Sequence, residues 1–102
     1  MKPEPVVLAR LRSDLLDAMW LAYPQALSLD QLESEVRGAY LTRPTSWLAT
    51  AIREQLTILN QARLIMPSTK GHLLTEAGRR DRQQAARFLG ATNNQPTPPE
   101  AA

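Results

Sequence analysis

The stretch RLIMPSTKGHLLTEAGRR (residues 63–80) contains two short apolar runs, a Pro-Ser-Thr-Lys-Gly break between them, and then a charged, helix-like segment. Leu64 to Met66 is too short for another helix, and Pro67 suits the end of a strand rather than the middle of a sheet. His72 to Leu74 forms the returning run, and the break contains the glycine that a hairpin connection needs. The stretch therefore predicts a β-hairpin followed by a helix that Thr75 caps.

Two helices are predicted in the first part of the chain. Residues 6–22 form the first, because Leu8, Leu11, Leu15, Ala18 and Met19 recur at three- and four-residue spacing. A short second helix begins near residue 29. Either Ser28 or Asp30 caps it, Gly38 is expected to end it in a left-handed conformation, and residues 26–29 are expected to include a brief extended piece.

The third helix has the strongest pattern and covers residues 47–62. Its apolar side contains Leu48, Ile52, Leu56 and Leu59, and its outward side is small and polar apart from Trp47. Thr45 or Ser46, directly after Pro44, is expected to cap it. The chain is thus predicted to be mainly helical with one small β-hairpin, in the order helix, helix, helix, hairpin, helix.

The length and composition indicate one compact domain. The chain has 102 residues, of which 43% are hydrophobic, enough for one core. We assign residues 6–90 to this domain, with the last helix at 75–89. The Pro-rich polar segment 91–102 is expected to be a disordered tail.

Several function classes have little support. The absence of cysteine excludes thiolate zinc sites and cysteine nucleophiles, and the one histidine, His72, is expected to be a half-exposed strand residue rather than a ligand. We find no glycine-rich phosphate loop, no carboxylate pair placed with a histidine, no apolar run of membrane-spanning length and no signal-peptide pattern. We therefore expect a cytoplasmic protein that is not an enzyme and needs no cofactor or metal.

The charges are unevenly distributed along the chain. Residues 1–36 contain three basic and six acidic side chains, whereas residues 37–99 contain nine basic and three acidic ones. A basic second half suits a surface that faces a polyanion, although an uneven solvated surface would look the same.

The element order and three segments resemble the winged helix-turn-helix domains of bacterial regulators such as the MarR, PadR and ArsR groups. The segments are SLDQLESEV (28–36), TSWLATAIREQLTILNQARLI (45–65) and GHLLTEAGRR (71–80), and the resemblance covers about residues 8–80. It implies that the third helix enters the major groove of double-stranded DNA and that the hairpin, or wing, contacts the adjacent backbone or minor groove. The DNA-binding residues that it implies are Arg43, Thr45, Ser46, Thr50, Arg53, Thr57, Thr69, Lys70 and His72.

Two features depart from the family pattern: the residue just before the wing, and the link between the second and third helices (residues 38–46), which is longer than a tight helix-turn-helix turn. Such domains often have glycine just before the wing, where this chain has Arg63; a left-handed Arg63 would be strained by roughly 1 kcal/mol, so the third helix is expected to end earlier, near Asn60. On the outward face of the third helix, Glu54 would repel phosphate. Trp47 is large for a groove contact, and it packs under the connecting segment or meets a partner. These residues support an alternative function, a winged helix that binds protein in a larger assembly.

A second apolar ridge on the first helix favours a further packing surface. This ridge, formed by Leu16, Trp20 and Tyr23, is covered either by the same chain or by a second subunit. In the resembling regulators, terminal helices pair across a two-fold axis. The resemblance thus implies a homodimer whose interface contains Leu16, Trp20, Tyr23, Ala85, Phe88 and Leu89.

Overall fold

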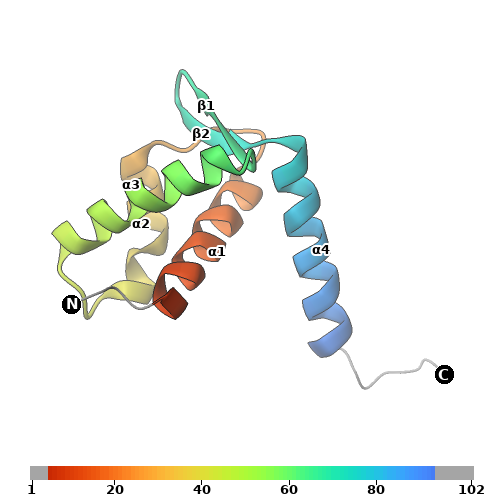
Figure 1. Cartoon of the computed structure of the whole chain (residues 1–102), viewed down its shortest axis with the longest axis horizontal. Helices are drawn as coiled ribbons and strands as arrows, with labels where there is room; N and C mark the ends of the chain where they lie inside the picture. The colour runs from red at the N-terminus through yellow and green to blue at the C-terminus, as the bar shows by residue number, and fades with distance from the viewer. Residues whose placement is uncertain (1–4, 94–102) are drawn as a thin grey trace.

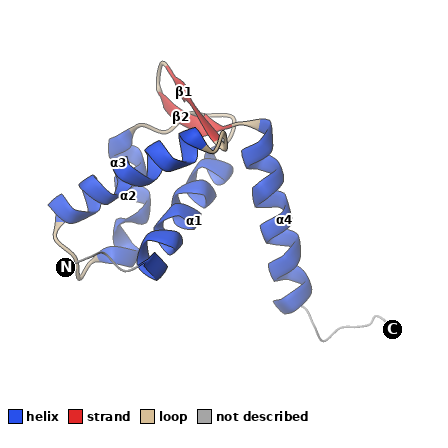
Figure 2. Cartoon of the chain, in the orientation of Figure 1, coloured by secondary structure: helices blue, strands red, loops and turns tan. Residues whose placement is uncertain are grey.

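The computed structural model describes the backbone of residues 5–93 and the side chains of residues 5–87. In this part, four α-helices, a 3-10 turn and a two-stranded antiparallel hairpin follow one another (Figures 1 and 2). The elements are α1 (Pro5–Ala22), α2 (Leu29–Val36), η1 (Arg37–Tyr40), α3 (Thr45–Gln61), β1 (Ile65–Ser68), β2 (Gly71–Leu74) and α4 (Glu76–Asn93). The predicted order of helices and hairpin is confirmed.

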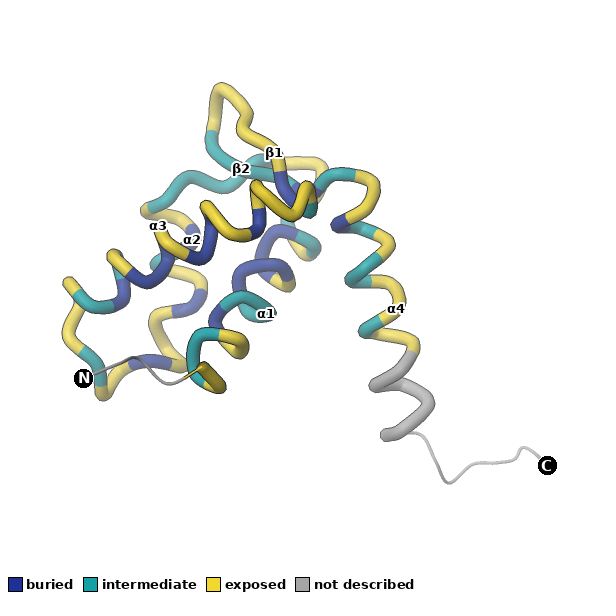
Figure 3. The backbone as a smooth tube through the Cα atoms, in the orientation of Figure 1, coloured by how far each residue is buried: buried dark blue, intermediate teal, exposed yellow. Residues whose placement is uncertain are grey.

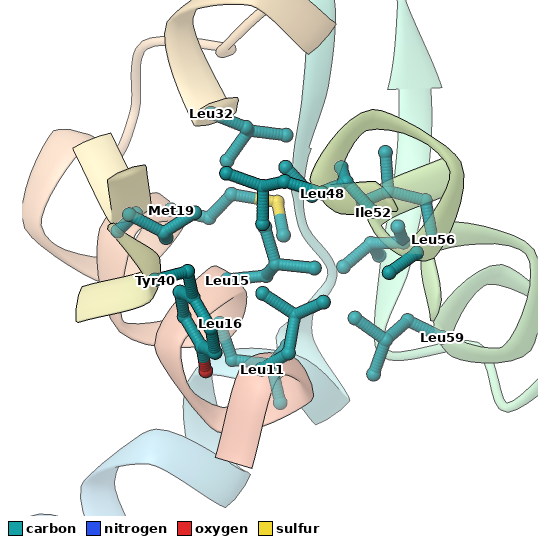
Figure 4. Close-up of a cluster of buried hydrophobic side chains, with 14 of the residues drawn as sticks. Leu11, Leu15, Leu16, Met19, Leu32, Tyr40, Leu48, Ile52, Leu56 and Leu59 are labelled. Carbon is teal, nitrogen blue, oxygen red and sulfur yellow. The ribbon is translucent and has the colours of Figure 1, made fainter. Parts of the chain in front are cut away.

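One core lies between α1, α2, α3 and the hairpin (Figures 3 and 4). The residues that the spacing placed inside α1 and α3 are buried, except Leu8, which is half-buried against the core. The side chains with the least exposure are Leu11, Leu15, Met19, Leu32, Leu48, Ile52, Ile65 and Leu74. Full burial of an aliphatic side chain of this size contributes about 1.5–3 kcal/mol, so these contacts dominate the stability of the domain.

The beginning of α2 has the cap that its sequence predicts. The Ser28 side chain accepts a hydrogen bond from the Gln31 N–H at 3.2 Å, and the Ser28 N–H donates to Gln31 Oε1 at 2.8 Å. The reciprocal pair satisfies two amide groups that the helix itself leaves without partners. Just before this cap, Leu27 pairs with His72 through two backbone hydrogen bonds of 2.8 Å, which confirms the expected extended piece and attaches it to the hairpin.

Two expected helix ends are wrong. Gly38 does not end α2 in a left-handed conformation, because the chain tightens into η1 and buries Tyr40, whose hydroxyl donates to Asp14 at 2.8 Å. Neither Thr45 nor Ser46 caps α3. Pro44 occupies the capping position with extended backbone, and both residues already lie in the first turn.

The end of α3 contradicts the expectation that the helix avoids a left-handed Arg63. The helix runs to Gln61, and Arg63 has a φ of 64°. The Leu64 N–H bonds the Leu59 carbonyl and the Arg63 N–H bonds the Asn60 carbonyl, both at 3.0 Å. This is a Schellman ending, in which two otherwise unpaired carbonyls are satisfied and offset the left-handed backbone.

The hairpin and α4 meet at a close packing point behind the end of α3. Thr75 caps α4 as predicted, accepting from the Gly78 N–H at 3.1 Å, and its hydroxyl donates to the Arg63 carbonyl at 2.6 Å. Gly78 lies so near the Leu64 carbonyl that a β-carbon would collide with it. Beyond this point α4 diverges from the other helices (Figure 1) and runs to Asn93, past its expected end at residue 89; residues 94–102 of the expected tail lie outside the described part.

Candidate nucleic-acid interface

The outward face of α3 is built by the same spacing that buries its other side. Because the aliphatic residues recur every three or four positions, the polar residues between them share the opposite face. The predicted contact residues of this helix are all exposed: Thr45, Ser46, Thr50, Arg53 and Thr57. Thr57 additionally donates its hydroxyl to the Arg53 carbonyl at 3.1 Å.

The hairpin contains three further predicted residues. Thr69 and Lys70 form the exposed two-residue turn, and His72 lies half-buried near the turn end of β2, opposite Pro67. Gly71 has a φ of 141° and lies against the Leu27 carbonyl, where a β-carbon would collide. The turn end of β2 is therefore held against the segment before α2.

A hollow joins α3, the hairpin and the start of α2. It has a volume of about 310 Å³, and its polar lining includes Arg53, Thr57, Asn60 and His72. Three of the predicted contact residues, from two separate elements, thus border one concavity. Asn60 was not predicted as a contact residue, although its spacing from Arg53 and Thr57 places it on the same side of the helix. The contribution of Leu29 and Pro67 to the apolar lining could not be predicted from the sequence, because these residues come from other elements and meet α3 only in the folded protein.

Three other predicted contacts, Arg43, Thr45 and Ser46, lie at the other end of α3. Arg43 stacks over the Trp47 ring, 4.7 Å from its centroid, and the Tyr40 ring lies 6.2 Å from the same centroid. Trp47 therefore packs against the segment that connects α2 to α3, which was one of the two predicted alternatives. Arg43, Thr45 and Ser46 form a separate group near the first turn of α3, away from the hollow.

The electrostatics of the exposed face differ from those of the core. Arg53 and Lys70 are exposed and have no ion pair with any described residue. In contrast, burial raises the pKa of Tyr40 to about 12, and the hydrogen bond to Asp14 and its negative charge act in the same direction. Arg53 and Lys70 are thus two exposed cations on α3 and the hairpin turn that a polyanion could reach.

The predicted dimer residues do not form one exposed surface. Leu16 is a core residue, only 4% exposed, because the same chain covers it; its assignment to a subunit interface is wrong. Trp20 is half-buried against the core, and Tyr23 is 38% exposed beneath the Arg79 guanidinium, 4.6 Å from its ring centroid. Ala85 is half-buried, and the side chains of Phe88 and Leu89 lie outside the described part.

Arg82 is a structural residue that sequence reasoning missed. Its guanidinium donates to Asp17 and Asp81, at 2.8 Å each, and to Ser13 at 3.2 Å, which ties α4 to α1. Burial lowers the pKa of Arg82, but the hydrogen bonds to the two carboxylates outweigh it, so the net pKa is raised. Its spacing of four residues from Gly78 was the available signal, since helical periodicity places both on one side of α4.

Comparison of the chain with protein-family models, curated proteins and solved structures finds no match. Residues 5–93 contain no group of three or more histidine, cysteine, aspartate or glutamate side chains placed to hold a metal ion. No helix in this range has both the length and the apolarity needed to cross a membrane. The geometry of the exposed face is therefore the basis for a functional proposal.

Proposed function

We propose that this chain is a winged-helix domain that binds double-stranded DNA as a cytosolic transcriptional regulator. In this proposal α3 is the recognition helix and the hairpin is the wing. The topology supports it, because Leu27 adds a short extended segment between α1 and α2 to the two strands after α3. The three segments that resemble bacterial regulators occupy α2, α3 and the junction of hairpin and α4.

The observation that carries the proposal is the hollow between α3 and the hairpin. It borders Arg53 and Thr57 on one side and His72 on the other, with the Lys70 turn projecting beyond it. An exposed arginine on a helix suits a guanine edge or a phosphate, and a lysine at a turn supplies a phosphate contact without fixed geometry. The exposed first turn of α3 adds backbone amides that attract a second phosphate.

Binding to duplex DNA at two salt concentrations tests the proposal. The purified, folded protein should bind a mixed-sequence duplex at low salt, and its affinity should fall steeply at moderate salt because phosphate contacts release counterions. Selection from a random duplex pool then identifies the preferred sequence. A folded protein that binds no duplex at low salt contradicts the proposal.

A protein-binding winged helix is the alternative that two observations favour. Glu54 is exposed on α3, and Ile58 on the same helix and Met66 on β1 are 43% and 45% exposed. A carboxylate and two exposed apolar side chains suit a protein partner better than a phosphate backbone. This alternative predicts that the folded protein binds no duplex. It also predicts that the protein binds a partner protein and that Ile58→Ser weakens this binding.

We also propose a homodimer, with Tyr23, the exposed part of Trp20 and Ala85 as its described contact residues. α4 diverges from the other helices (Figure 1), and the core that they share contains none of its described side chains. Light scattering at tens of micromolar should give about twice the chain mass of 11.4 kDa. A mass equal to one chain would overturn the dimer and leave the DNA proposal standing. A palindromic sequence from the random pool would support both.

A further inference from the structure

A second hollow lies on a different side of the molecule, between α1 and the α2–η1 segment. Its volume is about 250 Å³, and Ala18, Leu21 and Val36 contribute apolar lining. Leu21 is 83% exposed, the highest value among the large hydrophobic residues of the described part. An apolar concavity of this size suits one large side chain of a partner rather than a drug-sized ligand, which needs about 300–1,000 Å³.

Single exposed leucines are common on protein surfaces, so the exposure of Leu21 alone has little meaning. Its position matters because it borders a hollow that also contains the buried Val36 and Ala18. A side chain seated there would contact apolar atoms from both α1 and α2 and would cover Leu21 as well. This arrangement is typical of an anchor pocket in a helix-binding surface.

The charges around this hollow indicate which charge a bound partner would carry. Asp14, Asp17 and Glu35 contribute three carboxylates to the lining, against one guanidinium from Arg10. Asp17 is paired with Arg82, and Asp14 accepts the hydrogen bond from the Tyr40 hydroxyl. Glu35 is exposed and has no polar partner among the described residues. The hollow therefore favours a basic group next to the apolar anchor.

The hollow faces away from the proposed DNA interface. Arg12 marks the side of α1 that faces α3, because its guanidinium donates to the buried Gln55 at 2.8 Å. Asp14 and Leu21 lie on the opposite side of α1 by helical spacing. Figure 1 also shows α2 and η1 beside α1 on the side away from α4.

We propose that this hollow, formed by α1, α2 and η1, is a docking site for an amphipathic helix of a partner protein. The helix would insert an aliphatic or aromatic side chain beside Leu21 and place a lysine or arginine next to Glu35 and Asp14. The site is independent of α3, so a partner bound there and DNA bound at α3 do not compete. Its small size implies a weak, transient complex.

Nuclear magnetic resonance titration of the full chain with a helical peptide of leucine and lysine tests the site. The peptide should shift the amide signals of Ala18, Leu21 and Glu35, and a matching peptide of leucine and glutamate should not. Leu21→Ser and Glu35→Lys should each weaken binding about fivefold to tenfold, as loss of an anchor contact does. Both residues are exposed, so the melting temperature should change little.

Two matched variants separate this site from general attraction between charged surfaces. Glu54→Lys makes the same charge change on α3, and Met66→Ser makes a similar apolar-to-polar change on β1; neither should alter binding of the peptide. Equal losses in all four variants, equal binding of the leucine and glutamate peptide, or shifts centred on α3 would overturn the proposal. Concentration-dependent shifts of Leu21 and Glu35 without peptide would indicate that a second copy occupies the hollow, which also overturns it.

Discussion

Gly78 lies in the first turn of α4, where its amide donates to the Thr75 hydroxyl and its α-carbon faces the Leu64 carbonyl. The Thr-x-x-Gly pattern thus has a physical cause at each end: the threonine caps the helix, and the glycine admits the neighbouring backbone. Thr75 also donates to Arg63, so one side chain connects the end of α3 to the start of α4. The spatial relation between α3 and α4 depends on these few polar contacts.

Replacing Gly78 with alanine should destabilise the protein. Helix propensity alone would favour alanine by about 1 kcal/mol, but the collision with the Leu64 carbonyl should reverse the sign and cost about 1–3 kcal/mol. Urea denaturation measures the change. Gly38→Ala is the matched control, because a β-carbon there meets nothing within 4 Å. A Gly78→Ala protein as stable as the control would contradict the packing described at this residue.

Tyr40 should make stability depend on pH in the alkaline range. Its pKa is raised from 10.0 to about 12 in the folded protein, so the unfolded chain loses the hydroxyl proton first as pH rises. The folded state therefore binds more protons, and the free energy of unfolding should fall between about pH 10 and pH 12. Absorbance titration of Tyr23→Phe, in which Tyr40 is the remaining tyrosine, measures the folded pKa. Tyr40→Phe should lack this part of the pH dependence; an equal alkaline loss in that variant would contradict it.

At the scale of elements, α4 differs from the other helices in how it is held. The helices α1, α2 and α3 share an aliphatic core, whereas the described contacts of α4 beyond Gly78 are mainly polar. Arg82 is the centre of these contacts, with 11% of its side chain exposed. The angle between α1 and α4 therefore depends on a small number of hydrogen bonds and one stacked arginine.

The variant Arg82→Gln should loosen α4 while leaving the core folded. Removing a charge from a fully buried pair costs about 3–5 kcal/mol. Because 57% of the Asp17 side chain is exposed, we expect about 1–2 kcal/mol here. Hydrogen exchange should accelerate more in α4 than in α3. Arg80→Gln, which breaks an exposed pair with Glu76, serves as control and should change stability by less than about 0.5 kcal/mol. Equal acceleration in α3 and α4 would show that Arg82 supports the whole domain.

At the scale of the whole molecule, the acidic and basic halves of the chain contribute to two different surfaces. The acidic first half contributes the carboxylates around the α1–α2 hollow. The basic second half contributes Arg53 and Lys70 to the face formed by α3 and the hairpin. Two surfaces of different charge allow one small domain to bind two kinds of partner, which is the arrangement that we propose.

The two cations of the α3 face should affect DNA binding differently. Lys70→Ala should weaken binding by a similar factor on all sequences and reduce the salt dependence by about one phosphate contact. Arg53→Ala should change the preferred sequence, with a loss of about 1–3 kcal/mol for duplexes containing the contacted base. Competition assays with the selected duplex and scrambled duplexes separate the two effects. Arg80→Ala, on the exposed side of α4, is the control; identical effects of all three replacements would indicate nonspecific charge attraction.

Much of the fold was predictable from local signals. Aliphatic spacing located α1 and α3, the Ser28 and Thr75 caps marked the starts of α2 and α4, and the break at residues 67–71 indicated the hairpin. Helix ends were less predictable. The 3-10 turn after α2 depends on burial of Tyr40 against Asp14, which is 26 residues away in the sequence. The residues next to the turn therefore do not predict it.

The sequence by itself determined which residues face the core, where the hairpin forms and which polar side chains remain outside, because these follow from the three- to four-residue period of helices and from turn chemistry. Only the tertiary structure decided that Leu16 is covered by its own chain, that Arg63 adopts a left-handed backbone, and that Arg82 holds α4. It also placed Arg53 and His72 at one hollow and Leu21 and Glu35 at another. These outcomes depend on contacts between distant segments, whose geometry is set when the helices pack around a shared core.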